Sequence, residues 1–361
     1  MRTTTEMMLV PHLRNLLITL CLVVLSATVY LFEPAAAQDK SGQNSSASTQ
    51  QKQESNKKKD DKDNSQEQEN QETLRLGTEL VNLFFSVTDR QNRFITDIQQ
   101  DEIRILEDGK PQEIFSFQHE TDLPLTLAIL IDVSGSQEYT LPEEKMAAAR
   151  FLRSVVRPVK DLAAIVTFRG EVDLMQPLTS NKSRLERALE EVRYIPQTST
   201  DINSKFASTA LYDAIYLTAE EVLNREAGRR AIILLTDGED TSSTYKLDEA
   251  IQRAWRSEVI IYAIGIGDRF RFGVDEGTLK RICRETGGRA YFPKNDSDLN
   301  RAFAQIEQEL RSQYLVAYQP SNPLHDGSFR RVEVQITTRK DLHVTHRRGY
   351  YAPKGEKAEV K

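Results

Sequence analysis

The chain is poor in cysteine and has no excess of positive charge. Of its 361 residues only Cys21 and Cys283 are cysteines, and Cys21 lies in an apolar N-terminal stretch. The rest of the chain therefore holds one thiol, which excludes a fold stapled by internal disulfides without fixing the compartment. We expect Cys283 to be a small buried residue on a helix. The formal net charge of −6 offers no basic surplus for a phosphate backbone, so nucleic acid is not an expected partner.

The N-terminus carries the longest uncharged run of the sequence. Residues 15–32 are rich in Leu, Val and Ile, and Arg2 and Arg14 precede them. A Glu-Pro pair ends the run, and the three alanines that follow it provide the small residues of a signal-peptidase site. This layout predicts a secretory signal peptide in residues 1–37. An uncleaved membrane anchor is the alternative, because the run is near the short end of a bilayer span. Both predict an exported protein, periplasmic or secreted, that meets a membrane only through this segment.

Apolar residues are almost absent from the segment that follows. Residues 38–72 consist almost entirely of Gln, Asn, Ser, Lys, Asp and Glu. They bury too little apolar surface to offset the entropy lost on ordering, so we expect a disordered polar linker. We also expect residues 354–361 to form a disordered tail.

Residues 123–312 alternate between strand-like and helix-like patterns. Four apolar runs, at 125–131, 163–168, 231–235 and 259–264, read as buried strands. Helical patterns lie at 142–156, 210–224, 247–256, 276–286 and 297–311. A further helix is predicted to begin at a capping box formed by Ser183 and Glu186. This alternation predicts an α/β domain with a doubly wound, mostly parallel sheet.

Two β-rich flanks enclose the α/β domain. In residues 73–122 we expect strands at 80–87, 103–107 and 112–119, with a turn at 108–111. In residues 313–353 we expect strands at 314–318, 332–336 and 342–344. Neither flank is large enough to form a good core alone. We therefore predict that the two flanks pair into one small β-sandwich, into which the α/β domain is inserted.

Oxygen-bearing side chains follow two of the predicted strands. Asp132, Ser134 and Ser136 come directly after the first strand, and Asp237 follows the strand at 231–235. Ligands of open α/β sheets bind beyond the carboxyl ends of strands, and Thr209, which leads into a helix, can face the same crevice. Two carboxylates and three hydroxyls form a hard, all-oxygen ligand set. We expect it to hold Mg²⁺, with Mn²⁺ or Ca²⁺ as alternatives, and to leave room for water or a partner's carboxylate.

This constellation resembles the metal-ion-dependent adhesion site of von Willebrand factor type A domains. Asp-x-Ser-x-Ser at 132–136, Thr209 and Asp237 match that motif, and the wider sequence is similar to the bacterial VWFA-related proteins. The likeness runs from about residue 78 over most of the chain, with further matches at 107–111, 209–214, 286–292 and 347–351.

The resemblance implies a Rossmann-like domain and a role for each site residue. Ser134, Ser136 and Thr209 would contact the ion directly or through a water bound to it. Asp132 and Asp237 would supply negative charge, partly without touching the ion. The open metal position of this family receives an acidic residue of a protein ligand. We therefore predict an exported protein-binding module, and we expect Asp132→Ala to abolish ion binding while the sheet still forms, because the side chain would lie outside the core.

Catalysis is not predicted. An aspartyl phosphotransferase generally has a second acid two residues after its nucleophile, where this chain has Ser134. A dinucleotide loop starting at Gly265 lacks its third glycine. None of the five histidines lies in the α/β motifs, so a Ser-His-Asp hydrolase is unsupported; they are His12, His119, His325, His343 and His346. The alternative function is a structural scaffold of an envelope-associated complex, with a metal that only stabilises the fold or a vestigial site.

Overall fold

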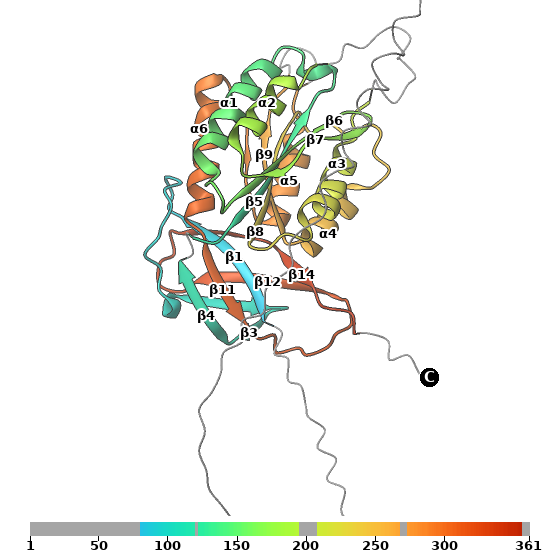
Figure 1. Cartoon of the computed structure of the whole chain (residues 1–361). Coiled ribbons are helices and arrows are strands. Elements are labelled where there is room, and N and C mark those ends of the chain that lie inside the picture. Colours follow the sequence, from blue (N-terminus) through green and yellow to red (C-terminus); the bar gives the residue numbers. More distant parts are fainter. Residues whose placement is uncertain (1–79, 120–121, 195–207, 268–272, 356–361) are drawn as a thin grey trace, which may run out of the picture. The chain divides into compact units, whose positions relative to one another are not determined.

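The computed structural model describes residues 80–119, 122–194, 208–267 and 273–355 (Figure 1). This part of the chain contains a six-stranded sheet and two four-stranded sheets. Within these ranges, no helix has both the length and the apolar character that a bilayer crossing requires. The predicted signal peptide or anchor, the polar linker and most of the C-terminal tail lie outside the described residues.

The six-stranded sheet has the order β10-β9-β8-β5-β6-β7. Its strands are β5 (Leu125–Asp132), β6 (Leu162–Phe168), β7 (Val172–Thr179), β8 (Arg229–Thr236), β9 (Val259–Gly265) and β10 (Ala290–Tyr291). All neighbours are parallel except β6 and β7, which are antiparallel. Every residue of β5 and of β9 is buried, as expected when helices cover both faces of a parallel sheet.

Helices cover the two faces of this sheet in two groups (Figure 1). One group consists of α1 (Leu141–Val155), α2 (Lys182–Glu191) and α6 (Asp296–Arg311). The other consists of α3 (Leu211–Leu217), the π-helix η4 (Thr218–Leu223), α4 (Leu247–Arg256) and α5 (Glu276–Thr286). Side chains of a strand alternate between faces, so Ile129 packs with the first group and Leu130 with the second. The doubly wound α/β fold predicted from the sequence is confirmed, and Cys283 is a buried free thiol on α5.

The flanking segments together form two antiparallel sheets. Their orders are β13-β1-β11-β4 and β14-β12-β2-β3. The first flank supplies β1 (Val81–Thr88), β2 (Ile103–Glu107), β3 (Lys110–Gln112) and β4 (Ile114–His119). The second supplies β11 (Tyr314–Tyr318), β12 (Phe329–Ile336), β13 (His343–His346) and β14 (Gly349–Tyr351).

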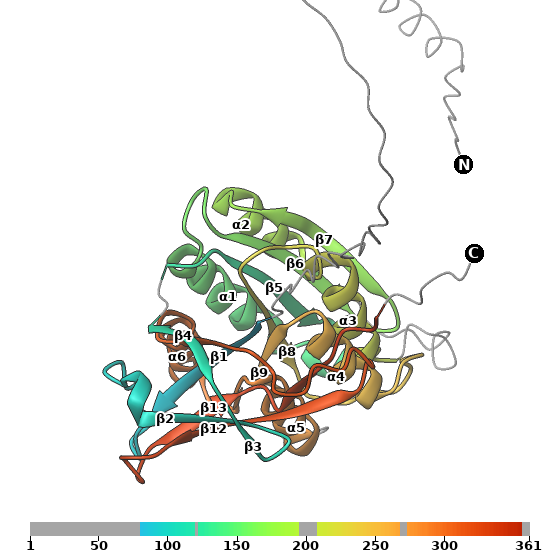
Figure 2. The ribbon, with the colours of Figure 1, turned by 90° about the horizontal axis from the view of Figure 1, so that it is seen from below.

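Each of the two sheets contains strands from both flanks. Leu83 of β1 pairs with Val316 of β11, and Ile105 of β2 pairs with Val334 of β12. Figure 2 shows β2 and β12 side by side. These four side chains belong to one buried cluster that joins the two sheets. The flanks therefore form one small β-sandwich, which confirms the predicted fold.

The strand predicted at 112–119 is divided between two sheets. β3 ends at Gln112, which pairs with Ile105, and β4 begins at Ile114, which pairs with Tyr318 of the other sheet. The predicted turn is also shorter than expected, because Lys110 and Pro111 already belong to β3. Asp108 and Gly109 alone make the turn, at φ +48° and +79°, the conformation that two-residue hairpin loops favour.

The capping box predicted at Ser183 is wrong. Helix α2 begins at Lys182, and the side chain of Asn181 accepts a hydrogen bond from the backbone N–H of Arg184 at 3.2 Å. Asparagine is among the residues that cap helices best. Since Asn181 is the residue that caps α2, Ser183 lies inside the first turn of the helix.

Candidate metal centre

Two aspartates lie where the strand order of the parallel sheet reverses. Asp132 is the last residue of β5, and Asp237 directly follows β8. β5 and β8 are neighbours, with β6 on the far side of β5 and β9 on the far side of β8. Such a switch point leaves a crevice beyond the carboxyl ends of the strands. The sheet topology thus brings together two aspartates that are far apart in sequence.

Asp132 is fully buried and held in place by two hydrogen bonds. The hydroxyl of Thr236 donates to its Oδ2 at 2.6 Å, and the backbone N–H of Ser134 donates to its Oδ1 at 2.9 Å. Burial is the largest cause that raises the pKa of Asp132 to about 7, and the charge of Asp237 is the second. The hydrogen bonds act in the opposite direction. The expectation that this side chain lies outside the core is wrong, because the end of β5 is covered like the rest of the strand.

The two serines of the motif face one another and the second aspartate. Ser134 Oγ and Ser136 Oγ are 3.1 Å apart. Burial raises the pKa of Asp237, and a hydrogen bond with the Ser136 side chain opposes that rise. The structure therefore brings Asp132, Ser134, Ser136 and Asp237 into one cluster of oxygen atoms.

Thr209 reaches the same edge of the sheet through its backbone. Its N–H donates to the hydroxyl of Thr241 at 2.8 Å, and its carbonyl accepts from the N–H groups of Thr241 and Ser242 at 2.9 and 3.1 Å. The N–H of the next residue, Ala210, donates to the carbonyl of Arg169, just beyond β6. Thr209, largely buried, is thus fixed between the loops that follow β6 and β8.

Sequence reasoning missed the residues that support this cluster. Thr236 binds Asp132, as described above. Gln137, fully buried, donates from Nε2 to Ser136 Oγ at 3.2 Å and to the carbonyl of Ile266 at 3.1 Å. Gln137 directly follows the last motif serine, yet nothing in a single sequence distinguishes a supporting glutamine from an exposed one.

The residues of the cluster fit a hard divalent cation. The carboxylate of Asp237 lies close enough to raise the pKa of Asp132, and the hydroxyls of Ser134 and Ser136 lie in the same cluster. A cation would relieve the repulsion and the burial of charge at once, and oxygen is the ligand that Mg²⁺, Mn²⁺ and Ca²⁺ prefer. Among the described residues no three His, Cys, Asp or Glu side chains are grouped to hold a metal. The set is therefore completed by hydroxyls rather than by a third acid.

Relatives among curated proteins match half of the chain. The chain is 24% identical over 192 residues to an uncharacterized protein of Borreliella burgdorferi, covering 47% of this chain and 54% of that protein. It is 25% identical over 203 residues to a UPF0353 protein of Mycobacterium avium, covering 50% and 59%. The chain thus spans less than two thirds of the length of these curated relatives.

Solved structures of low sequence identity also match. BatB from Bacteroides thetaiotaomicron is 20% identical, with 53% of this chain and 100% of that chain covered and a TM-score of 0.41. A von Willebrand factor type A protein from Catenulispora acidiphila is 13% identical, with 76% and 74% covered and a TM-score of 0.45. Proximal thread matrix protein 1 from the mussel byssus, with a zinc-occupied MIDAS motif, is 20% identical, with 55% and 48% covered and a TM-score of 0.44.

The family model of the von Willebrand factor type A domain matches residues 126–307. This range runs from the start of β5 into α6 and so contains the whole oxygen cluster. The chain belongs to the von Willebrand factor type A domain family.

Proposed function

We propose that this chain is a metal-dependent protein-binding module. In this proposal one divalent cation, with Mg²⁺ preferred, is held by a set of five side chains, namely Asp132, Ser134, Ser136, Thr209 and Asp237. The observation that carries the proposal is the burial of Asp132 beside Asp237, since two carboxylates are costly to keep together without a counter-charge.

The ligand set suits binding to an acidic partner. It brings only two negative charges, so a bound divalent cation would keep positive character and an open position. A carboxylate of a protein partner would be attracted to that position, because the interaction is strong in a site shielded from water. Thr236 and Gln137 would keep Asp132 and Ser136 oriented before the partner arrives. No step of this scheme makes or breaks a covalent bond in the partner.

Calorimetric titration of Mg²⁺ and Mn²⁺ tests the metal site. We expect saturable binding to the unaltered chain and none to Asp132→Asn, which keeps the side-chain shape but loses the charge. Asp173→Ala, an exposed position on the edge strand β7, is the control and should bind like the unaltered chain. Identical titrations of the Asp132→Asn variant and the unaltered chain would refute the assignment.

A pull-down from an envelope extract separates recognition from a scaffold role. If an acidic group of the partner completes the metal shell, partners should be recovered with Mg²⁺ and lost with a chelator. Equal recovery of every partner under both conditions would favour a structural scaffold whose metal only stabilises the fold.

The proposal includes export through residues 1–37. These residues carry the sequence pattern of a signal peptide. If they stay as an anchor, residues 38–72 would separate the folded part from the membrane. If they are cleaved, residues 38–72 would be released together with the folded part. Mass spectrometry of the protein from its native cell checks this proposal. A mature N-terminus near residue 38 indicates cleavage, and an intact one in the membrane fraction indicates an anchor.

A further inference from the structure

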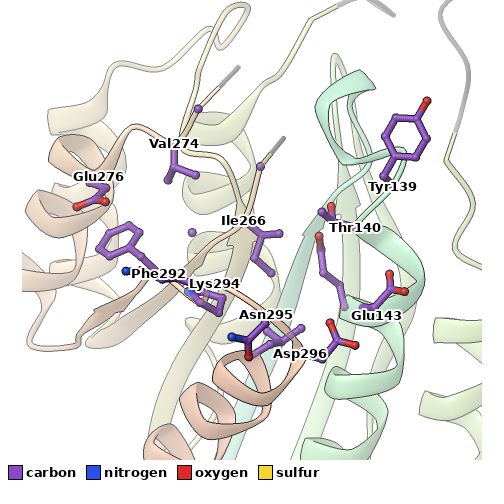
Figure 3. A pocket seen from close by; sticks show the side chains of 16 residues that line it. Tyr139, Thr140, Glu143, Ile266, Val274, Glu276, Phe292, Lys294, Asn295 and Asp296 are labelled. Atoms are coloured by element: carbon purple, nitrogen blue, oxygen red, sulfur yellow. The ribbon is translucent and has the colours of Figure 1, made fainter. Parts of the chain in front are cut away.

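A cavity beside the proposed metal centre has no assigned role. It has a volume of about 520 Å³ and lies between the start of α1, the end of β9 and the starts of α5 and α6. Figure 3 shows Thr140 and Glu143 on one side of it and Val274 and Phe292 on the other. A cavity of this size accommodates a small organic molecule.

Glu144 is a buried acidic side chain of this cavity. Neither of its carboxylate oxygens forms a hydrogen bond within the part of the chain that the structure describes. The neighbouring Thr140 hydroxyl donates to Gln137 Oε1 at 3.0 Å. An isolated buried carboxylate costs several kcal/mol by general estimates. A positive group in the cavity would compensate this charge.

The other lining groups favour a cation with an apolar chain. Two further acids, Glu143 and Asp296, line the cavity together with one base, Lys294, and a third acid, Glu276, is paired with Lys280 at 2.6 Å. The lining also includes the apolar side chains of Ile266, Val274, Phe292 and Leu299. Lys280 Nζ lies 5.0 Å from the centre of the Phe292 ring, so this ring already accepts a cation on its face.

The arrangement of the acids disfavours a second metal ion. Of the acids that line the cavity, Glu144 alone is fully buried, and one carboxylate provides too few oxygen ligands for a divalent cation. A single buried carboxylate at an apolar wall instead matches an ammonium or guanidinium group, which needs one counter-ion and tolerates an apolar surface around its chain.

We propose that this cavity binds an organic cation, a primary ammonium or guanidinium group on an apolar chain, with Glu144 as its counter-ion. The site is distinct from the metal centre and does not require a metal. Gln137 links the two sites, because its side chain donates to Ser136 of the metal centre and to the carbonyl of Ile266 in the cavity wall.

Binding of four small probes to the purified full chain tests this proposal. The probes are butylammonium, butylguanidinium, neutral 1-butanol and the anion butyrate, and binding is followed by calorimetry and NMR. We expect the two cations to bind with dissociation constants on the order of millimolar, as suits molecules of so few atoms. The neutral and anionic probes should bind roughly tenfold more weakly or not at all. Equal binding of butylammonium and 1-butanol, or no binding of either cation, would overturn the proposal.

A pair of variants locates the counter-ion. Glu144→Gln removes the charge with little change of shape and should weaken butylammonium binding roughly tenfold or more. Glu190→Gln, an exposed position on α2, should leave it unchanged. Unchanged affinity in folded Glu144→Gln would also overturn the proposal. If that variant does not fold, the comparison of butylammonium with 1-butanol on the unaltered chain still decides.

Two further arms identify the source of the cation and separate this site from the metal centre. A lysine whose α-amino and carboxyl groups are both blocked binds as well as butylammonium if the natural ligand is a side chain of a protein partner, and more weakly if it is a free amine.

All titrations are repeated with a chelator. Butylammonium binding that persists there supports an independent site even if the metal assignment fails, whereas loss of binding on chelation contradicts it.

Discussion

Asp132, Asp237 and Glu144 are buried acids that repel one another. The charge of Asp237 helps to raise the pKa of Asp132, and the charges of both aspartates help to raise that of Glu144. For Glu144, burial is the largest cause and brings the pKa to about 8. The metal-free protein therefore contains carboxyls that hold protons near neutral pH.

Without metal, the stability of the protein should fall as the pH rises from about 4 to about 8. The ordinary values for Asp and Glu are 3.8 and 4.5, whereas Asp132 and Glu144 titrate at about 7 and about 8. In this window the native state binds more protons than the unfolded state, so stability decreases with pH. Each group contributes to this loss on the order of 1 kcal/mol per pH unit at most.

Urea unfolding in chelator at several pH values measures this slope. His346, whose burial lowers its pKa from 6.5, acts in the opposite direction below pH about 6.5. The slope above that pH is therefore the informative one, and Glu144→Gln should flatten it. A stability that is constant or rises over this range in both proteins would show that the acids are not protonated as inferred.

The site residues differ in how far a sequence can predict them. Asp132 and Asp237 stand at the ends of apolar runs, and the end of a strand in a parallel sheet is a place that the chain pattern itself marks. The burial of Glu144 is different. Its direct neighbours on α1, Glu143 and Lys145, are also charged, and the walls that bury Glu144 come from β9, α5 and α6, which only the tertiary fold brings together.

At the scale of elements, the central strands of the six-stranded sheet were predictable, and its edge strands β7 and β10 were not. β5, β8 and β9 are continuous apolar runs because helices cover both sheet faces. β7 has mostly exposed or half-exposed residues and contains a proline, so its pattern does not differ from that of a loop. β3 and β4 together look like one strand, since a single residue separates them and their change of sheet depends on which partners lie beside them.

The start of α2 gives a direct test of a local structural correction. Asn181→Ala removes the side chain that accepts from the N–H of Arg184, and should cost about 1 kcal/mol of unfolding free energy. Ser183→Ala should change it by less than about 0.5 kcal/mol, because Ser183 is exposed within the first turn. Equilibrium unfolding in urea measures both. The reverse ranking would restore the capping box that the sequence predicted.

At the scale of the whole described structure, the β-sandwich is tied to the α/β domain by a buried polar contact. The described residues, which begin at Leu80 and end at Gly355, belong to one compact unit. Within it, Ser86 of β1 donates to Glu309 Oε1 of α6 at 2.7 Å, and Arg289 Nε lies 3.0 Å from Glu309 Oε2. Arg289 also donates to the hydroxyls of Thr88 and Thr345 at 3.3 and 3.0 Å.

The pairing of the flanks was predictable because each lacks a core, whereas this contact was not. A buried acid in one helix and an arginine before β10 have no sequence signature that names them as partners. Their positions follow from the register of β1 and β13 and from the packing of α6 on the sheet, which many side chains decide together.

Arg289→Met should therefore destabilise the whole unit by about 3 kcal/mol, because it leaves Glu309 buried without its counter-charge. Combining it with Glu309→Met should recover part of the loss, since the isolated charge is then gone. Arg284→Met, an exposed position on α5, should change the stability by less than about 0.5 kcal/mol. Urea unfolding of the four proteins measures these differences. If Arg289→Met costs no more than Arg284→Met, the ion pair does not hold the two parts together and the apolar contacts around it carry the interface.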